Sequence, residues 1–336
     1  MTGALTIQVV GPGLSVQDLG RPGHMATGLS RGGAADRLAL FEAAALLGLP
    51  AVVGAVEMAG QGGRFQTSEP TRFALTGAPM TATLDGAPLS WAASHLLLPG
   101  QTLTISGARA GFYGYLTPAG GVAGPRFLGS VAAHLAVGIG GLLKAGDRIA
   151  IGPDPDPSAP SQRLIVPDRF SGGDIRFMPG PQTDLFSPET LTRFQETDFT
   201  RSPKGNRQGV RLDHAAAPFA AEIQGLASDL VRPGDLQVTG EGVPYGLLCE
   251  CQTTGGYGRI GTVIDADLPR LAQAAPGARL RFRLLSLDEA DALYQPETEI
   301  LAKLCQAAQP LTRNPHDIPD LLSYQLISGV VAGNEE

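Results

Sequence analysis

A short pattern, in which a glycine leads into alternating apolar and polar residues, recurs along the chain. It appears as PGQTLTI (Pro99–Ile105), AGDRIAI (Ala145–Ile151) and PGARLRF (Pro276–Phe282), and in a form one residue shorter as PGDLQV (Pro233–Val238). Each copy predicts a tight turn followed by a strand, because alternation with a period of two is typical of half-buried strands. Two copies lie in each half of the chain, which favours two related β domains in tandem. Pro-Gly turns are common in any β protein, however, so the repeat alone does not demonstrate a duplication.

Helical patterns are fewer than strand patterns. Three segments have helix-forming composition: Asp36–Leu49, Asp267–Ala275 and the run ETEILAKLCQAA after Pro296. Two more helix starts are marked by an N-cap at Ser187-Pro188-Glu189 and by a capping box at Ser286–Glu289. Pro296 should separate the helix that begins at Ser286 from the run ETEILAKLCQAA, since proline cannot continue a helix. We therefore expect a mainly β protein with a few short helices and a helical C-terminal tail.

The stretch GPDPDPSAPSQ (Gly152–Gln162) divides the chain into two halves. Its content of Pro, Asp and Ser is typical of a linker. A length of 336 residues also suits two domains better than one. We expect an N-terminal β domain over residues 1–155, a second β domain over 163–286 and the helical tail over 287–336.

Composition and charge narrow the class of protein. The net charge is −7 and no basic stripe is present, which argues against nucleic-acid partners. No apolar run reaches the ~18 residues that a membrane helix needs, and the N-terminus lacks the pattern of a signal peptide. The three cysteines, Cys249, Cys251 and Cys305, are an odd number without C-x-x-C spacing, which indicates a reducing compartment. We expect a cytoplasmic protein without membrane contact.

Familiar catalytic and metal-binding motifs are missing from the sequence. It contains neither G-x-x-x-x-G-K-[ST] nor H-E-x-x-H, and its five histidines are scattered singly. We therefore expect no metal site. A Ser-His-Asp set stays open, because the members of such a triad meet in space and not in sequence.

The segment VQDLGRPG (Val16–Gly23) is unusually dense in polar groups. Gln17, Asp18 and Arg21 crowd around a glycine and a Pro-Gly turn. The functional interpretation is a loop that offers an amide, a carboxylate and a guanidinium to a small polar substrate, with the arginine docking a carboxylate or phosphate. The alternative is a turn held together by a contact between Asp18 and Arg21.

Two further segments combine polar residues with glycine. In NRQGVRL (Asn206–Leu212), Arg207 and Arg211 flank Gly209, which suits an anion clamp, although solvated surface arginines are equally ordinary. In CECQTTGGYGRI (Cys249–Ile260), the polar and glycine positions are Gln252, Thr253, Thr254, Gly255, Gly256 and Tyr257. Paired glycines let the backbone approach a ligand and aim N–H groups at an oxyanion or phosphate. The alternative is a Gly-Gly hairpin turn with the tyrosine packed on it.

Taken together, these segments resemble one family. They are, in order, PGLSVQDLGRPG (Pro12–Gly23), GGAADRLAL (Gly32–Leu40), GAVEM (Gly54–Met58), LTPAGGV (Leu116–Val122), PGPQTDLF (Pro179–Phe186), NRQGVRL, and CQTTGGYGRIGTVIDADLPRLAQAAPGARLRF (Cys251–Phe282). Over roughly residues 5–285 the chain is similar to the biotin-dependent carboxyltransferase-like family, also called allophanate hydrolase subunit 2-like. That family includes the C subunit of bacterial ATP-dependent 5-oxoprolinase and one half of the carboxyltransferase region of urea carboxylase. The resemblance implies two cyclophilin-like β-barrels in tandem.

The chain departs from the usual family pattern in a few places. It has Gly33-Ala34-Ala35-Asp36 where the family usually has Gly-Ala-Met-Asp, and it lacks the usual Asn in the helix that follows. Glu250 stands where Asp is usual, and Gly258 where Pro is usual. These differences leave the scaffold unchanged but allow a different substrate.

The resemblance implies a protein that helps to open the lactam of 5-oxoproline to glutamate, with ATP used by the complex and with A and B subunits as partners. A first alternative is a carboxyltransferase that acts on a urea-like substrate. The chain has three lysines and no Met-Lys-Met segment, so any carboxybiotin would be carried on another protein. A second alternative is a non-catalytic regulatory module that binds a homologue of the B subunit.

The resemblance also implies a site for a small amide substrate in a cleft between the two halves. The residues expected to take part in catalysis are Asp18, Arg21, Gln252, Thr253 and Tyr257. Those expected to bind the substrate are Gln17, Asp36, Arg207, Arg211, Thr254, Gly255 and Gly256.

Overall fold

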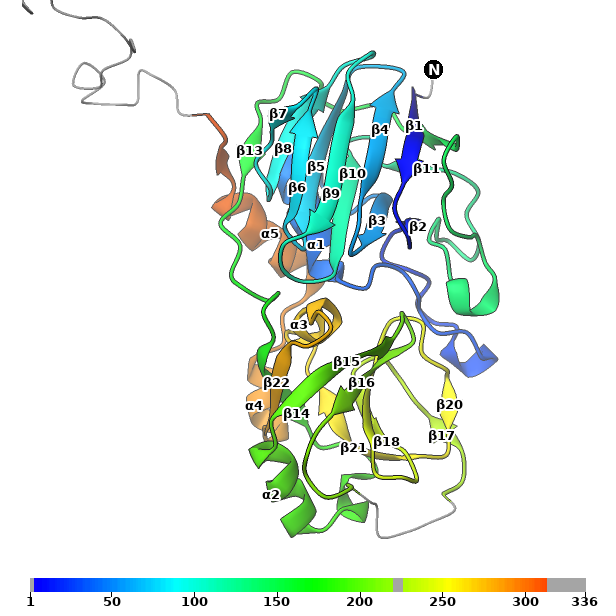
Figure 1. Cartoon of the computed structure of the whole chain (residues 1–336), viewed down its shortest axis with the longest axis vertical. Helices are drawn as coiled ribbons and strands as arrows, with labels where there is room; N and C mark the ends of the chain where they lie inside the picture. The colour runs from blue at the N-terminus through cyan, green and yellow to red at the C-terminus, as the bar shows by residue number, and fades with distance from the viewer. Residues whose placement is uncertain (1–2, 220–225, 313–336) are drawn as a thin grey trace, which may run out of the picture.

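The computed structural model describes residues 3–219 and 226–312. It has two β-rich halves, stacked along the long axis of the molecule, with helices α1 (Arg37–Leu47) and α3 (Leu268–Gln273) at the level where the halves meet (Figure 1). The prediction of a mainly β fold is confirmed.

The first half contains two seven-stranded sheets. The first sheet has the order β11 (Val122–Ala123), β12 (Arg148–Ile151), β1 (Gly3–Val10), β4 (Gly63–Thr67), β9 (Leu103–Ala108), β6 (Met80–Leu84) and β7 (Ala87–Pro88). The second has the order β2 (Ser15–Gln17), β3 (Ala55–Ala59), β10 (Tyr113–Pro118), β5 (Thr71–Gly77), β8 (Ala93–Leu97), β13 (Gln162–Arg163) and β23 (Gln309–Pro310). Alternate residues of both sheets meet in one core, in which Ile7 and Phe65 pack with Val56 and Phe73.

The second half is a closed barrel. Its strand order is β14 (Gly173–Met178), β21 (Gly258–Val263), β18 (Asp235–Val238), β19 (Pro244–Leu247), β16 (Gly209–Asp213), β15 (Phe199–Gly205) and β22 (Arg279–Leu284), and β22 pairs in parallel with β14 to close it. Its core is rich in phenylalanine: Phe177, Phe194, Phe199, Phe219 and Phe282. A separate two-stranded sheet joins β17 (Asp229–Leu230) to β20 (Thr254–Gly255).

The four repeated turn-and-strand segments have the predicted structure. Gly100, Gly146, Gly234 and Gly277 have φ values of 89°, 92°, 94° and 89°, and they lead into β9, β12, β18 and β22 respectively. A φ in this range strains residues that have a Cβ, which explains why glycine stands at the same place in every copy.

The predicted helices are also present. Their bounds are Arg37–Leu47 for α1, Pro188–Glu196 for α2, Leu268–Gln273 for α3, Leu287–Ala292 for α4 and Glu297–Ala307 for α5, with short 3-10 helices at Met25–Thr27 (η1), Leu135–Val137 (η2) and Thr183–Leu185 (η3). Ser187 caps α2 as predicted, and the capping box of Ser286 and Glu289 opens α4. Pro296 separates α4 from α5.

The C-terminal segment returns to the first half of the molecule. Leu301 and Leu304 of α5 pack against the cluster of buried side chains around α1, and β23 extends the second sheet by pairing with β13. Helices therefore do occupy the start of the predicted tail, while residues 313–336 lie outside the described residues. The predicted linker is tied to the first half as well, since Asp154 forms a buried ion pair with Arg72 of β5.

Candidate functional site

One face of the second sheet carries a row of buried polar side chains. Ser15 of β2, Glu57 of β3, Tyr115 of β10 and Thr76 of β5 are cross-strand neighbours, and each is at most 1% exposed. Side chains alternate across a strand, so the residues between them face the apolar core of the first half. A polar row on a buried sheet face requires partners, because each unpaired buried polar group costs free energy.

Glu57 and Tyr115 form the centre of this row. The Tyr115 hydroxyl donates to Glu57 Oε2 over 2.7 Å, the backbone N–H of Ala35 donates to the same oxygen, and that of Asp36 donates to the hydroxyl. Burial, followed by the negative charge of Glu57, raises the pKa of Tyr115 well above its ordinary value. Tyr115 therefore stays a neutral hydrogen-bond donor that helps to hold the Gly32–Leu40 segment on the sheet.

Arg207 reaches this row from the second half. Its guanidinium donates to Glu57 Oε1, to the carbonyl oxygen of Gly33 and, over 2.6 Å, to Glu250 Oε1. Burial would lower the pKa of Arg207, but the neighbouring Cys249, Glu57 and Glu250 raise it well above its ordinary value. The guanidinium is thus directed at two carboxylates and not at open space, so an anion bound there would have to displace a carboxylate.

Glu250 connects the row to a second cluster made of Ser30, His134 and Arg21. Ser30 Oγ lies 2.9 Å from His134 Nε2, and His134 Nδ1 lies 3.8 Å from Glu250 Oε2, which also accepts from the backbone N–H of Ala136. The order hydroxyl, imidazole, carboxylate is that of a proton relay, but at 3.8 Å the contact between the imidazole and the carboxylate is not a hydrogen bond. Ser30, His134 and Glu250 are all at most 3% exposed, so the set lies at the joint between the halves and is closed to substrate in this conformation.

Two predicted residues of the VQDLGRPG segment lie beside this cluster. Asp18 accepts hydrogen bonds from Gly20 N, Ser130 Oγ and Val131 N. The Arg21 guanidinium donates to backbone carbonyls of the facing loop, Ala132 among them. Among the described residues no hydrogen bond or ion pair joins the side chains of Asp18 and Arg21, so the turn contact considered as an alternative does not form.

Arg21 and His134 each keep a buried nitrogen without a partner among the described residues. These atoms are Arg21 Nη1 and His134 Nδ1, and both side chains are 1% exposed. Burial lowers the pKa of both residues, although the charge of Glu250 opposes the shift in each. Gly32 keeps the space between them open, because a Cβ there would lie 2.9 Å from the imidazole of His134 and 3.3 Å from Arg21 Nη1.

The other predicted residue of that segment, Gln17, lies on the same sheet face as the polar row. It is fully buried, its Nε2 donates to Ser15 Oγ over 2.9 Å, and its Oε1 has no partner among the described residues. Gln17 is therefore a buried partner of Ser15 and not a surface group.

The QTTGGY segment is a short strand and not a hairpin turn. Thr254 and Gly255 form β20, Thr253 is buried, and its carbonyl oxygen accepts from Val231 N over 3.0 Å. Tyr257 is 51% exposed, so it does not pack on the glycines as the structural alternative required. The segment begins two residues after Glu250, beyond the buried Cys251, so it leads from the charged cluster to the surface.

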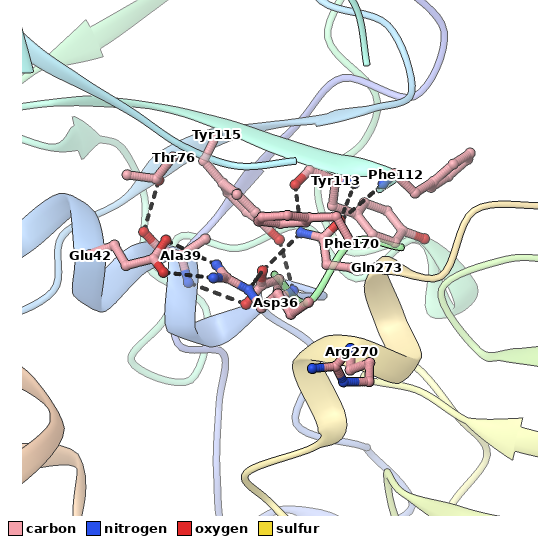
Figure 2. Close-up of polar contacts among 12 residues, drawn as sticks. Asp36, Ala39, Glu42, Thr76, Phe112, Tyr113, Tyr115, Phe170, Arg270 and Gln273 are labelled. Atoms are coloured by element: carbon pink, nitrogen blue, oxygen red, sulfur yellow. Dashed lines mark hydrogen bonds and ion pairs between the residues drawn. The ribbon is translucent and has the colours of Figure 1, made fainter. Parts of the chain in front are cut away.

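The carboxylate of Asp36 is buried in a second network, which joins the two halves (Figure 2). It caps α1 by accepting from Ala39 N, and its Oδ2 accepts from Arg169 Nε and from Gln273 Nε2, each over 2.8 Å. Arg169 also forms two hydrogen bonds with Glu42, whose pKa burial raises against the opposing effect of Arg169. With its carboxylate fully engaged, Asp36 positions the helix and the joint.

Gln273 of α3 completes that network. Its Oε1 accepts from the backbone N–H groups of Phe112 and Tyr113, and its Nε2 donates to the carbonyl oxygen of Tyr113 (Figure 2). One fully buried amide therefore fastens the second half to strand β10 of the first.

The remaining predicted residue, Arg211, is not part of these networks. It lies in β16, donates to Asp213 over 2.7 Å, and lines a cavity of about 160 Å³ together with His214. A second cavity, of about 250 Å³, is lined by Asp18, Gly54 and the Gly120–Val122 stretch. Neither cavity includes Arg21 or the 253–257 segment, so a cleft shared by these groups stays a prediction.

Several groups that form the site were missed from the sequence. They are Ser30, Glu57, Tyr115, His134, Arg169, Gln237 and Gln273. Glu57 carried a usable signal, since it is a charged residue between Val56 and Met58 in a strand that is otherwise apolar. The others gave no local signal, because their partners lie 15 or more residues away in the sequence.

The described residues offer little to a metal ion or to thiol chemistry. Within them, no group of three or more His, Cys, Asp or Glu side chains could hold a metal. Burial raises the pKa of both Cys249 and Cys251 to about 12, so these thiols stay protonated near neutral pH. In the same part of the chain, no helix is long and apolar enough to cross a membrane.

Comparisons with known proteins show the family of the chain. The model of the family described as carboxyltransferase domain, subdomain A and B, matches residues 27–284. The chain is 37% identical over 281 residues to the 5-oxoprolinase C subunit of Escherichia coli (82% of this chain, 89% of that protein), and 33% identical over 280 residues to that of Haemophilus influenzae, with the same coverage. A putative urea carboxylase of Emericella nidulans is 28% identical over 288 residues (80% of this chain, 23% of that protein).

The fold itself matches a solved structure. The crystal structure of Kluyveromyces lactis urea carboxylase superposes with a TM-score of 0.78 at 22% identity, covering 93% of this chain and 31% of that one. At this identity the likeness concerns the fold alone.

Proposed function

The chain belongs to the family of the carboxyltransferase domain, subdomain A and B, and on that premise we propose that it is the C subunit of an ATP-dependent 5-oxoprolinase. One observation carries the proposal: two relatives that bear this name are 37% and 33% identical to the chain, and the match covers 89% of each. The proposed complex opens the lactam ring of 5-oxoproline to glutamate with A and B subunits, in the cytoplasm.

The chemistry of the reaction explains why several subunits and ATP are proposed. An amide carbonyl is a poor electrophile, and phosphorylation of its oxygen makes it a better one. The chain has no G-x-x-x-x-G-K-[ST] loop, so ATP use is assigned to the complex. The contribution proposed for this chain is to bind and orient the lactam, and its QTTGGY segment is suited to that task because Gln252, Thr254 and Tyr257 are exposed.

A carboxyltransferase is the second candidate, favoured by the family description and by the relative from Emericella nidulans. That relative is less similar and much longer than this chain. The only lysines, Lys144, Lys204 and Lys303, lie in no Met-Lys-Met segment, so carboxybiotin would arrive on another protein. A regulatory module without catalysis is the remaining alternative.

One assay separates these candidates. The purified chain is combined with its A and B subunits, and glutamate is measured from 5-oxoproline with and without ATP. In parallel, the chain is given a carboxylated biotin carrier and urea. Glutamate formation that requires both ATP and this chain supports the proposal. Carboxyl transfer to urea without glutamate formation would replace it with the second candidate.

A further inference from the structure

Two side-chain amides meet at the QTTGGY segment. Gln252 Nε2 donates to Gln237 Oε1 over 3.0 Å. Gln237 belongs to β18 of the barrel and is 5% exposed, whereas Gln252 is exposed. The pair thus consists of a fixed, buried amide that holds a second amide at the surface.

Gly255 is the reason the two amides can lie so close to the backbone. A Cβ at this position would lie 2.7 Å from Gln237 Nε2 and 3.6 Å from Gln252 Nε2. The first distance is shorter than real Cβ contacts, so a side chain at position 255 would push Gln237 out of place. The glycine therefore leaves the room that Gln237 occupies, and Gln237 in turn accepts the hydrogen bond that holds Gln252.

Gln237 keeps one polar atom without a partner among the described residues, namely Nε2. Exchanging the assigned oxygen and nitrogen in both amides still leaves one bond between them and one unpaired atom on Gln237. A buried amide left incomplete in this way indicates that the pair is not there for stability alone.

Gln252 has hydrogen-bonding capacity to spare. One of its N–H groups is used by Gln237, while its Oε1 and its second N–H make no hydrogen bond within residues 3–219 and 226–312. An amide offers an acceptor and a donor side by side. Its natural complement is another amide whose C=O and N–H point the same way.

We propose that Gln252, positioned by Gln237 and Gly255, recognises the cis-amide edge of the substrate through paired hydrogen bonds. A lactam ring forces its amide to be cis, so its C=O and N–H lie side by side, and urea offers the same edge. An open-chain trans amide presents the two groups on opposite sides and cannot form the pair. This inference rests on the proposed function because it takes the lactam as the substrate. The same recognition applies to any ligand with a cis-amide edge.

The test measures equilibrium binding to the assembled complex. The probes are 5-oxoproline, its N-methyl derivative, the lactone that has ring oxygen in place of N–H, and urea. The wild-type complex should bind 5-oxoproline about tenfold more tightly than the lactone or the N-methyl derivative, the difference expected for one hydrogen bond.

Substitutions at the amide pair give the decisive comparison. Gln252→Met, Gln237→Met and Gly255→Ala should each weaken lactam binding by about tenfold and remove the preference over the lactone. Gln237→Glu keeps an acceptor for Gln252 and should retain the preference, which separates positioning from mere packing. Gly240→Ala is the matched control, because a Cβ there meets nothing within 4 Å.

The outcomes distinguish this inference from the proposed function. If 5-oxoproline binds and all three variants keep the lactam preference, the inference is overturned while the function stands. If urea binds through the amide pair and 5-oxoproline does not, the inference stands while the function falls. If the wild-type complex binds neither compound, both are overturned.

Discussion

Arg207 of the second half and Glu57 of the first half form a buried ion pair. The same guanidinium pairs with Glu250, so a single arginine neutralises two carboxylates at the joint between the halves. A buried charge cluster of this kind contributes less to stability than its contacts suggest, but removing one partner is costly. The geometry of these contacts fixes how the two halves meet. It thereby also fixes the positions of the segments that resemble the family.

The first prediction concerns Arg207. Replacement by alanine leaves Glu57 and Glu250 buried without a counter-charge and should reduce the free energy of unfolding by about 3–5 kcal/mol. Urea unfolding of the purified chain measures this. Arg211→Ala is the matched control: that arginine is more exposed, its salt bridge is with a half-exposed Asp213, and its loss should leave the stability nearly unchanged. An unchanged stability for Arg207→Ala, combined with lost substrate affinity in the complex, would instead make Arg207 an anion clamp.

The second prediction concerns pH and His134. Burial lowers the pKa of His134 in the folded chain. Below a pH of about 6.5, the unfolded chain therefore binds a proton at His134 that the folded chain does not bind. Stability should therefore fall as the pH drops below about 6.5. His134→Asn removes that proton and should flatten the decrease. Unfolding curves between pH 5 and 7.5 measure it, and identical slopes for both proteins would show that burial does not lower the pKa of His134.

The third prediction concerns the repeated turns. Gly277→Ala should reduce stability by about 1–2 kcal/mol, because φ is 89° there and a Cβ meets no atom within 4 Å, so backbone strain is the whole cost. Gly240→Ala has equal space without that φ and should be neutral or slightly stabilising. Thermal unfolding of the two variants compares them directly. Equal melting temperatures would show that the turn has another conformation.

The fourth prediction concerns Gln273. Gln273→Leu should reduce stability by about 1–3 kcal/mol for each buried group it leaves unpaired, among them the N–H groups of Phe112 and Tyr113. It should also loosen the joint, so that the two halves unfold in separate steps. Calorimetry resolves one transition from two. A single, unshifted transition would mean that Asp36 and Arg169 hold the joint without Gln273.

The local parts of this fold could be predicted from the sequence. The repeated glycine turns, the N-cap at Ser187 and the capping box at Ser286 each depend on residues within one turn of one another, and all are present. The division into β halves followed from the same local patterns.

The site could be predicted only as a set of segments. The motifs around Asp18, Arg207 and Glu250 do bring residues to one joint, but their contacts link positions more than a hundred residues apart. Arg207 looked like a surface or anion-binding arginine because neither Glu57 nor the burial of the joint is visible locally. Gln237 was missed because its partner Gln252 lies 15 residues further along the chain, beyond strand β19.

We propose that this chain is an essential component of a 5-oxoprolinase complex, and we expect it to have no activity alone. The most direct measurement is glutamate formation from 5-oxoproline and ATP by the assembled complex, by the chain alone, and by the A and B subunits without it. The account predicts ATP-dependent turnover in the complete mixture and none in the other two. Full turnover by the isolated chain, or by the A and B subunits without it, would contradict it.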